Sequence, residues 1–169
     1  MGESVDLKQE ANPEYYMSQA LQEANRALEH GEVPIGCVVV HKEQGMVARA
    51  HNWRETWKSP IAHAEMVAIE EASRRLGGWR LFECDIYVTL EPCPMCAGAI
   101  MLSRFSHLYF GARDPKGGAV VSKTELLAPD LWNHHPDITG GVLEYECGKI
   151  LKDFFRSLRQ GKASFDQRS

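Results

Sequence analysis

Two short motifs carry the side chains that metal-dependent hydrolysis requires. An H-x-E motif supplies His63 and Glu65, and a P-C-x-x-C motif supplies Cys93 and Cys96. Two thiolates and one neutral imidazole suit zinc, and they leave its fourth tetrahedral position for a water molecule. Because zinc lowers the pKa of a bound water to near neutrality, this set of three ligands predicts an open, water-activating metal site.

Glu65 is better placed to carry protons than to bind the metal. Two positions after His63 in the first turn of a helix, its carboxylate can reach a metal-bound water. Ser59 followed by Pro60 predicts the start of this helix, which should end at Gly77. Prolines on both sides of Cys93 predict a second helix start, where the helix dipole favours thiolates.

A C-x-x-C motif alone would equally suit a redox pair or half of a structural zinc site. A structural site needs a second pair of closely spaced ligands. The remaining cysteines, Cys37, Cys84 and Cys147, stand singly in apolar stretches. We expect them to be buried free thiols that act as small hydrophobic residues.

Length and composition are those of a soluble globular protein with one domain. The chain has 169 residues, of which 44% are hydrophobic. We therefore expect one domain over residues 13–160, with a flexible N-terminus at 1–12 and a flexible basic tail at 161–169. No apolar stretch approaches a membrane span and the polar start is unlike a signal peptide, so we expect no membrane partner. An odd number of cysteines favours a reducing, cytoplasmic location.

The net charge of −4 argues against general affinity for nucleic acids. The distribution of charge is uneven, however. From Lys149 to the end, six basic residues stand against two acidic ones, a local balance of +4. This end of the chain is the candidate phosphate-facing surface.

Hydrophobic periodicity predicts an α/β fold with a mixed sheet. A hairpin is followed by strands that alternate with helices. Helices are expected over 13–30 and 147–158, besides the two that start at the metal motifs. Strands are expected over 35–40, 46–50, 85–90, 107–110 and 138–143.

Beyond the two metal motifs, the chain resembles the bacterial tRNA adenosine deaminase family, a branch of the cytidine/deoxycytidylate deaminase superfamily. The H-x-E and P-C-x-x-C pair is typical of zinc-dependent nucleobase deaminases in general. The resemblance extends from about residue 15 to residue 160. It is carried by 33–36 (VPIG), 62–66 (AHAEM), 87–93 (YVTLEPC), 95–99 (MCAGA), 110–114 (FGARD), 133–134 (NH) and 154–156 (FFR).

The resemblance implies a cytidine deaminase-like fold, a three-layer α/β/α arrangement with a five-stranded mixed sheet. It also implies one zinc ion per subunit, a homodimer whose partner subunit completes the substrate groove, and a tRNA anticodon stem-loop as substrate. The expected reaction is hydrolytic deamination of the wobble adenosine to inosine, with Glu65 as the catalytic residue and His63, Cys93 and Cys96 as the metal ligands.

The same resemblance assigns substrate contacts, each of which has an ordinary structural alternative. Asn52 would bind the flipped purine, or be a turn asparagine. The backbone at Ala64 would orient the base between walls formed by Val33, Pro34 and Leu90, which equally suit the core. Contacts with the rest of the RNA are expected at Asn133, His134, Asp114, Lys116, Phe155 and Arg156. The ordinary alternative for the first four is a solvated loop. For the last two it is a core phenylalanine beside an exposed arginine.

Two other functions remain open at the level of sequence. A deaminase of free guanine, cytosine or a nucleoside would share the zinc chemistry, but would have no use for a basic C-terminal end. A catalytically silent zinc module that binds RNA would not need Glu65. Inosine formation in an anticodon stem-loop distinguishes the three.

Overall fold

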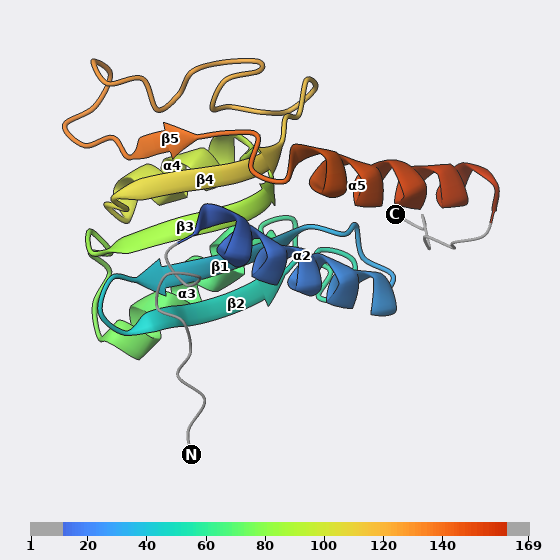
Figure 1. Cartoon of the computed structure of the whole chain (residues 1–169), viewed down its shortest axis with the longest axis horizontal. Helices are drawn as coiled ribbons and strands as arrows, with labels where there is room; N and C mark the ends of the chain where they lie inside the picture. Colours follow the sequence, from blue (N-terminus) through green and yellow to red (C-terminus); the bar gives the residue numbers. More distant parts are fainter. Residues whose placement is uncertain (1–11, 162–169) are drawn as a thin grey trace.

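A computed structural model describes residues 12–161 as a five-stranded sheet with helices on both faces (Figure 1). The strand order is β2-β1-β3-β4-β5, in which β1 is antiparallel to β2 and β3, whereas β3, β4 and β5 are parallel. The expected α/β fold with a mixed sheet is confirmed. The elements are α2 (Pro13–Glu29), β1 (Gly36–His41), β2 (Gly45–His51), α3 (Ala64–Leu76), β3 (Cys84–Leu90), α4 (Pro94–Leu102), β4 (His107–Ala112), β5 (Asp137–Thr139) and α5 (Glu144–Arg159).

The sheet separates two apolar cores, as the alternation of side chains along its strands requires. Cys37 and Val39 of β1 pack in the larger core, which α3 and α4 cover. Val38 and Val40 point to the opposite face and pack with Met17 of α2 and Cys147 of α5. Figure 1 shows α2 in front of β1 and β2, with α3 and α4 behind the sheet. The result is the expected three-layer arrangement.

Helix α2 fixes the start of β1. Its N-cap is Asn12, whose side chain accepts a hydrogen bond from the Glu14 amide at 3.0 Å, and Pro13 occupies the first turn. Gly36 then runs directly beneath the helix. A Cβ atom at Gly36 would lie 1.8 Å from the Ala20 carbonyl oxygen, so only glycine allows this close approach.

Two of the sequence-based boundaries are wrong. Helix α3 begins at Ala64 with His63 as its N-cap, whereas Ser59 and Pro60 belong to the preceding loop. Turns between Arg54 and Ile61, closed by the hydrogen bond from Ser59 N to Arg54 O at 3.1 Å, use the residues that looked like a helix start. The fifth strand covers only residues 137–139, because the chain leaves the extended conformation at Gly141 (φ 81°) and turns at 142–143 into α5.

Of the ends that we expect to be flexible, 1–12 and 161–169, residues 1–11 and 162–169 lie outside the described residues. Asn12 and Gly161, which border them, are an N-cap and a turn. No helix within residues 12–161 is both long enough and apolar enough to cross a membrane. Cys37, Cys84 and Cys147 are buried and free, as predicted.

Candidate metal centre and substrate pocket

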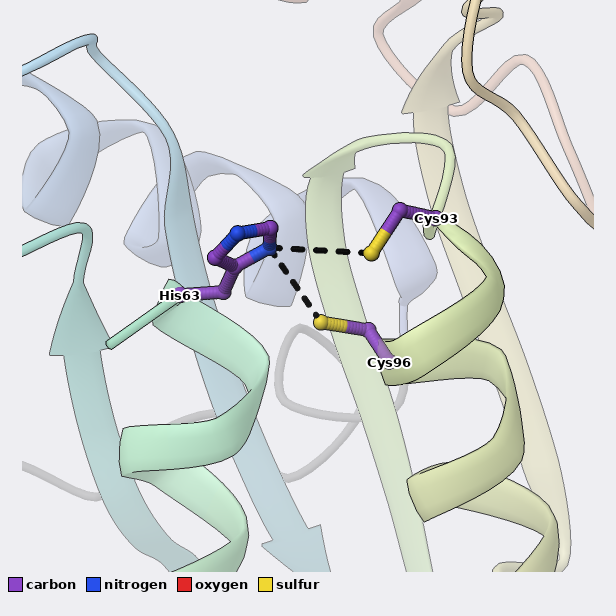
Figure 2. A group of neighbouring side chains, drawn as sticks. All are labelled: His63, Cys93 and Cys96. Carbon is purple, nitrogen blue, oxygen red and sulfur yellow. Dashed lines mark hydrogen bonds between the residues drawn. The ribbon is translucent and has the colours of Figure 1, made fainter. Parts of the chain in front are cut away.

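The three expected metal ligands lie at the starts of two helices whose N-terminal ends are side by side (Figure 2). His63 is the N-cap of α3, Cys93 is the N-cap of α4, and Cys96 lies in the first turn of α4. Neither N-cap side chain makes a capping hydrogen bond. Figure 2 shows the imidazole reaching from one helix toward the two sulfur atoms of the other. Both side chains are therefore available for another partner.

The distances between these side chains fit a tetrahedral zinc ion. His63 Nδ1 lies 3.7 Å from Cys93 Sγ and 3.5 Å from Cys96 Sγ (Figure 2), and the three ligand atoms all lie within 4.8 Å of one another. Zinc bonds of about 2.3 Å to sulfur and about 2.0 Å to nitrogen, at the tetrahedral angle, would separate nitrogen from sulfur by about 3.5 Å. The two nitrogen–sulfur distances match this value closely.

The ligand set remains open on one side. Among residues 12–161, no fourth histidine, cysteine or carboxylate joins His63, Cys93 and Cys96 in a group with metal-binding spacing. Two soft thiolates and an imidazole select zinc over magnesium or calcium. Three protein ligands with a free position are the arrangement of a catalytic rather than a structural zinc site.

The two thiols differ in their affinity for protons. A hydrogen bond from Cys96 lowers the pKa of Cys93 to about 4, and the same interaction, together with burial, raises the pKa of Cys96. A hydrogen bond with Cys93 raises the pKa of His63. Because metal ions bind cysteine as the thiolate, binding of an ion would release a proton from any sulfur that still carries one.

Glu65 lies in the first turn of α3, is only 4% exposed, and faces the same cavity as His63 and Cys93. Burial raises the pKa of its carboxyl group, opposed by its own backbone amide and by the Cys96 thiol. A raised pKa brings a carboxyl group closer to the range in which it can exchange protons with a bound water. Glu65 therefore has the location and the chemistry expected of a proton carrier.

A cavity of about 300 Å³ opens over the metal ligands, beyond the ends of β3 and β4. This volume is at the lower end of the range for small-ligand sites, about 300–1,000 Å³, and suits a single base better than a longer fragment. Of the residues predicted to bind substrate, the cavity is lined by Asn52, Ala64, Val33, Leu90, Asp114 and Phe155. Pro34 is buried beside it and is not a lining residue; Ile35 lines it in its place.

Asn52 has the contacts of a turn asparagine and also lines the cavity. Its side-chain oxygen accepts a hydrogen bond from the Arg54 amide at 3.1 Å, and its side-chain nitrogen donates to the Val33 carbonyl at 3.4 Å. It is thus a turn asparagine. Because a carboxamide offers two donor hydrogens and two acceptor lone pairs, one of each remains for a ligand in the cavity that it lines.

A second, larger hollow continues from the cavity and shares Val33, Leu90, Asp114 and Phe155 with it. We call it the basic groove. The predicted contacts Lys116 and Arg156 lie there, and Phe155 is 43% exposed while its neighbour Phe154 is buried in the core. The charged residues that line it are one acidic residue, Asp114, and five basic ones, Arg113, Lys116, Lys152, Arg156 and Arg159.

Asn133 and His134 are not brought to this pocket. The His134 ring lies 2.9 Å from the Phe105 carbonyl oxygen, just before β4 begins, whereas the pocket lies beyond the end of β4. Six residues of strand separate these two ends by about 20 Å. Neither residue lines the cavity or the basic groove.

Three lining residues were not predicted from the sequence. Arg54 and Glu91 line the cavity, and Arg113 lines the basic groove. Lys152 and Arg159, which also line the groove, belong to the basic C-terminal end that we expect to face phosphates. Arg54 follows Asn52 by two residues, and Glu91 precedes Cys93 by two, but neither has a side-chain pattern that marks a site.

The family model for the cytidine and deoxycytidylate deaminase zinc-binding region matches residues 10–112, which include all three metal ligands and Glu65. The chain belongs to this deaminase family. The fold and the ligand geometry agree with that membership, since the expected cytidine deaminase-like sheet and an open His-Cys-Cys cluster are both present.

Within the family, the chain is similar to the tRNA-specific adenosine deaminase of Bacillus subtilis (strain 168), with 54% identity over 149 residues, which cover 88% of this chain and 92% of that protein. A solved structure from a study of A-to-I editing by tRNA:A34 deaminases at the wobble position of transfer RNA has 44% identity and a TM-score of 0.77, over 81% of this chain and 99% of that one. The guanine deaminase of Bacillus subtilis is less similar, with 35% identity and a TM-score of 0.58, over 60% and 65%.

Proposed function

We propose that this protein is a zinc-dependent deaminase that converts adenosine to inosine at the wobble position of a tRNA anticodon. The observation that carries the proposal is the continuity of the two hollows. A base-sized cavity over an open metal-ligand cluster leads directly into a groove with five basic side chains. A single extruded base fits the first, and the phosphates that flank it fit the second.

The chemistry follows from Glu65 and the three ligands. A zinc ion, one per subunit, held by His63, Cys93 and Cys96 would supply a Lewis acid that makes water nucleophilic near neutral pH. Glu65 takes a proton from the attacking water and delivers it to N1 of the purine as the oxygen bonds to C6. It then transfers the second proton of the water to the amino group, so that the C6–N bond breaks and ammonia leaves.

The residues around the cavity would hold the base for this step. Asn52 has one donor and one acceptor left for the purine edge, while Val33 and Leu90 exclude water from its faces. Pro34 contributes only by fixing the backbone between Val33 and Ile35. Beyond the pocket, Phe155 offers an exposed ring on which an unstacked base can lie, and Asp114, Lys116 and Arg156 border the path of the strand.

We further propose a cytoplasmic homodimer, which would bring Asn133 and His134 to the groove of the partner subunit. Helix α4 supports an interface because none of its nine residues is charged. It buries Cys96, Ala97 and Ile100, yet Leu102 on another side is 62% exposed. An apolar helix exposed in this way favours contact with a second chain. Location in a reducing compartment suits the thiolate ligands.

The substrate test is analysis of the nucleoside products of an adenosine-bearing anticodon stem-loop. Wild-type protein should form inosine, and Glu65→Gln should lose at least about 10³-fold in turnover while keeping its zinc, because only the proton carrier is removed. Inosine formation by Glu65→Gln at the wild-type rate would exclude this role for Glu65. Release of ammonia from free guanine or cytosine, with none from the stem-loop, would favour the free-base alternative.

The dimer is tested separately by light scattering at working concentration. Wild-type protein should have twice the mass of the 19.0 kDa chain. Leu102→Glu should shift it to the monomer, because a charge in an apolar interface is left without a partner. A monomeric wild type would contradict the dimer and, with it, the proposed role of Asn133 and His134.

A further inference from the structure

Glu91 is a buried carboxylate that the deaminase chemistry does not use. It lies between the end of β3 and the metal ligand Cys93, and it is 2% exposed. Within residues 12–161, no arginine, lysine or histidine forms an ion pair with it. A buried charge without a counter-charge requires strong compensation by hydrogen bonds.

The compensation comes entirely from one segment, residues 113–122, which follows β4. Oε2 of Glu91 accepts hydrogen bonds from three successive amides, those of Val120, Val121 and Ser122, at 3.2, 3.0 and 3.0 Å. Oε1 accepts from the Asp114 amide at 3.1 Å and from the Ser122 hydroxyl. Successive backbone amides directed at one oxygen form the kind of concave cradle that binds anions, filled here by a side chain of the protein.

The backbone of Glu91 and Pro92 holds both ends of the same segment. The Glu91 amide donates to the Ala112 carbonyl at 2.8 Å, and the Ala119 amide donates to the Pro92 carbonyl at 2.8 Å. Gly118 completes the fit, since a Cβ atom there would lie 2.3 Å from the Glu91 carboxyl group. The segment is thus attached to the two residues that immediately precede Cys93.

We propose that Glu91 is a positioning residue: its carboxylate folds the 113–122 segment against the metal-ligand loop and so places one wall of the RNA groove. The wall consists of Arg113, Asp114 and Lys116, which line the groove, and Asp114 also lines the cavity. The inference rests on the proposed function, because it assigns to Glu91 the alignment of that groove with the metal ligands.

A direct role in proton transfer does not suit Glu91. An ionised carboxylate has about four lone-pair directions, and five donors from the segment already occupy them. Both carboxyl groups line the cavity, but in the described part of the chain no side-chain hydrogen bond from a loop segment occupies Glu65 in this way. Glu91 therefore acts on substrate only through the segment that it holds.

The test is Glu91→Gln in the full-length zinc-loaded protein. Glutamine has nearly the same shape, but its amide group presents hydrogens to amides that need an acceptor, so the segment should loosen. We expect KM for the anticodon stem-loop to rise about tenfold with kcat within about threefold, a pattern typical of lost substrate positioning rather than lost chemistry. The zinc content should remain that of the wild type.

Glu23→Gln is the matched control. Glu23 is also a buried carboxylate, 3% exposed, but it bonds to Arg26 and Arg49 at 3.0 and 2.9 Å on the side of α2. Its loss should lower the melting temperature without raising KM. An unchanged KM in Glu91→Gln, or an equal rise in Glu23→Gln, would overturn the proposal.

Hydrogen exchange gives a readout that needs no substrate. In Glu91→Gln, the amides of Val120, Val121 and Ser122 should exchange at least about tenfold faster, with no such change in Glu23→Gln. If Glu91→Gln does not fold, Ser122→Ala removes one donor and should raise KM about twofold to threefold, with faster exchange at the same amides. Hydrogen exchange at the wild-type rate in these variants would refute the positioning role. Absence of inosine formation by the wild-type protein would refute the proposed function alone.

Discussion

At the scale of single residues, two buried carboxyl groups beside the metal ligands have opposite environments. Burial raises the pKa of Glu65, and the few groups that oppose it are weaker. Burial acts on Glu91 in the same direction, but hydrogen bonds from Ser122 and from the amides of Val121, Ser122 and Asp114 outweigh it and lower the pKa. The first group is suited to exchanging protons and the second to remaining ionised. Their environments, not their residue type, separate a chemical role from a structural one.

Asp85 on β3 gives a prediction for stability against pH. Burial raises its pKa, His107 opposes the rise, and Asp137 adds to it. Ionised Asp85 therefore disfavours the folded state at neutral pH, and this cost disappears as pH falls through the folded pKa toward the unfolded value of about 3.9. Asp85→Asn should raise the free energy of unfolding at pH 7, and the gain should vanish near pH 4, as measured by urea denaturation at each pH.

Asp130→Asn is the control for this measurement. Asp130 lies in an exposed turn, so the substitution removes the same charge without relieving burial. Its free energy of unfolding should match that of the wild type at every pH. A gain for Asp85→Asn that persists below pH 4 would show that packing, rather than ionisation, is responsible.

Functional side chains that belong to one short motif could be predicted from the sequence. A side chain whose partners are far away in the sequence could not. The three metal ligands and Glu65 were found because their spacing within two short motifs reflects helix geometry. Glu91 was missed because its partners are backbone amides 23 to 31 residues away, which carry no residue-type pattern. Pro34 does not line the cavity for a related reason, since alternate residues of an extended segment face opposite sides.

At the scale of elements, α5 supplies much of the basic groove. Arg156 lines it, with only a weak contact of 3.6 Å to Asp153, and is solvent-accessible. If it contacts a phosphate, Arg156→Ala should weaken stem-loop binding and reduce the slope of log Kd against log salt concentration by about 0.7. Binding titrations at several salt concentrations measure this slope.

Arg75→Ala controls for the loss of one positive charge. Arg75 is exposed in the last turn of α3 and does not line the groove. Its substitution should leave the salt slope unchanged. Equal slopes for Arg156→Ala and wild type would show that α5 does not contact the phosphates.

Elements with strong periodicity were predicted almost to the residue, and those marked only by turn residues were not. Helix α2 and strands β1 and β3 follow their apolar patterns. The start of α3 was placed four residues early because Ser59 and Pro60 suit a turn as well as a helix start. What decides between them is Glu32, whose buried carboxylate accepts hydrogen bonds from the Glu55 and Thr56 amides and so forms a turn in the loop before α3.

At the scale of the whole molecule, folding and metal binding depend on the same helix starts. Removal of zinc by a chelator should lower the melting temperature, because an ion at 100 times its Kd stabilises the folded state by about 2.7 kcal/mol. The loss of protection from hydrogen exchange should be largest at the first turns of α3 and α4. Calorimetry with and without chelator measures the shift, and Cys93→Ser, which lacks one ligand, should show a much smaller one.

The use of His63 and Cys93 as N-caps without capping bonds constrains how this chain can change. Serine or aspartate at either position would stabilise its helix by about 1 kcal/mol through a capping hydrogen bond. Each such exchange would also delete a metal ligand. Substitutions that increase thermal stability must therefore be made at other positions. A homologue with ordinary N-caps at both positions would be expected to lack catalytic activity.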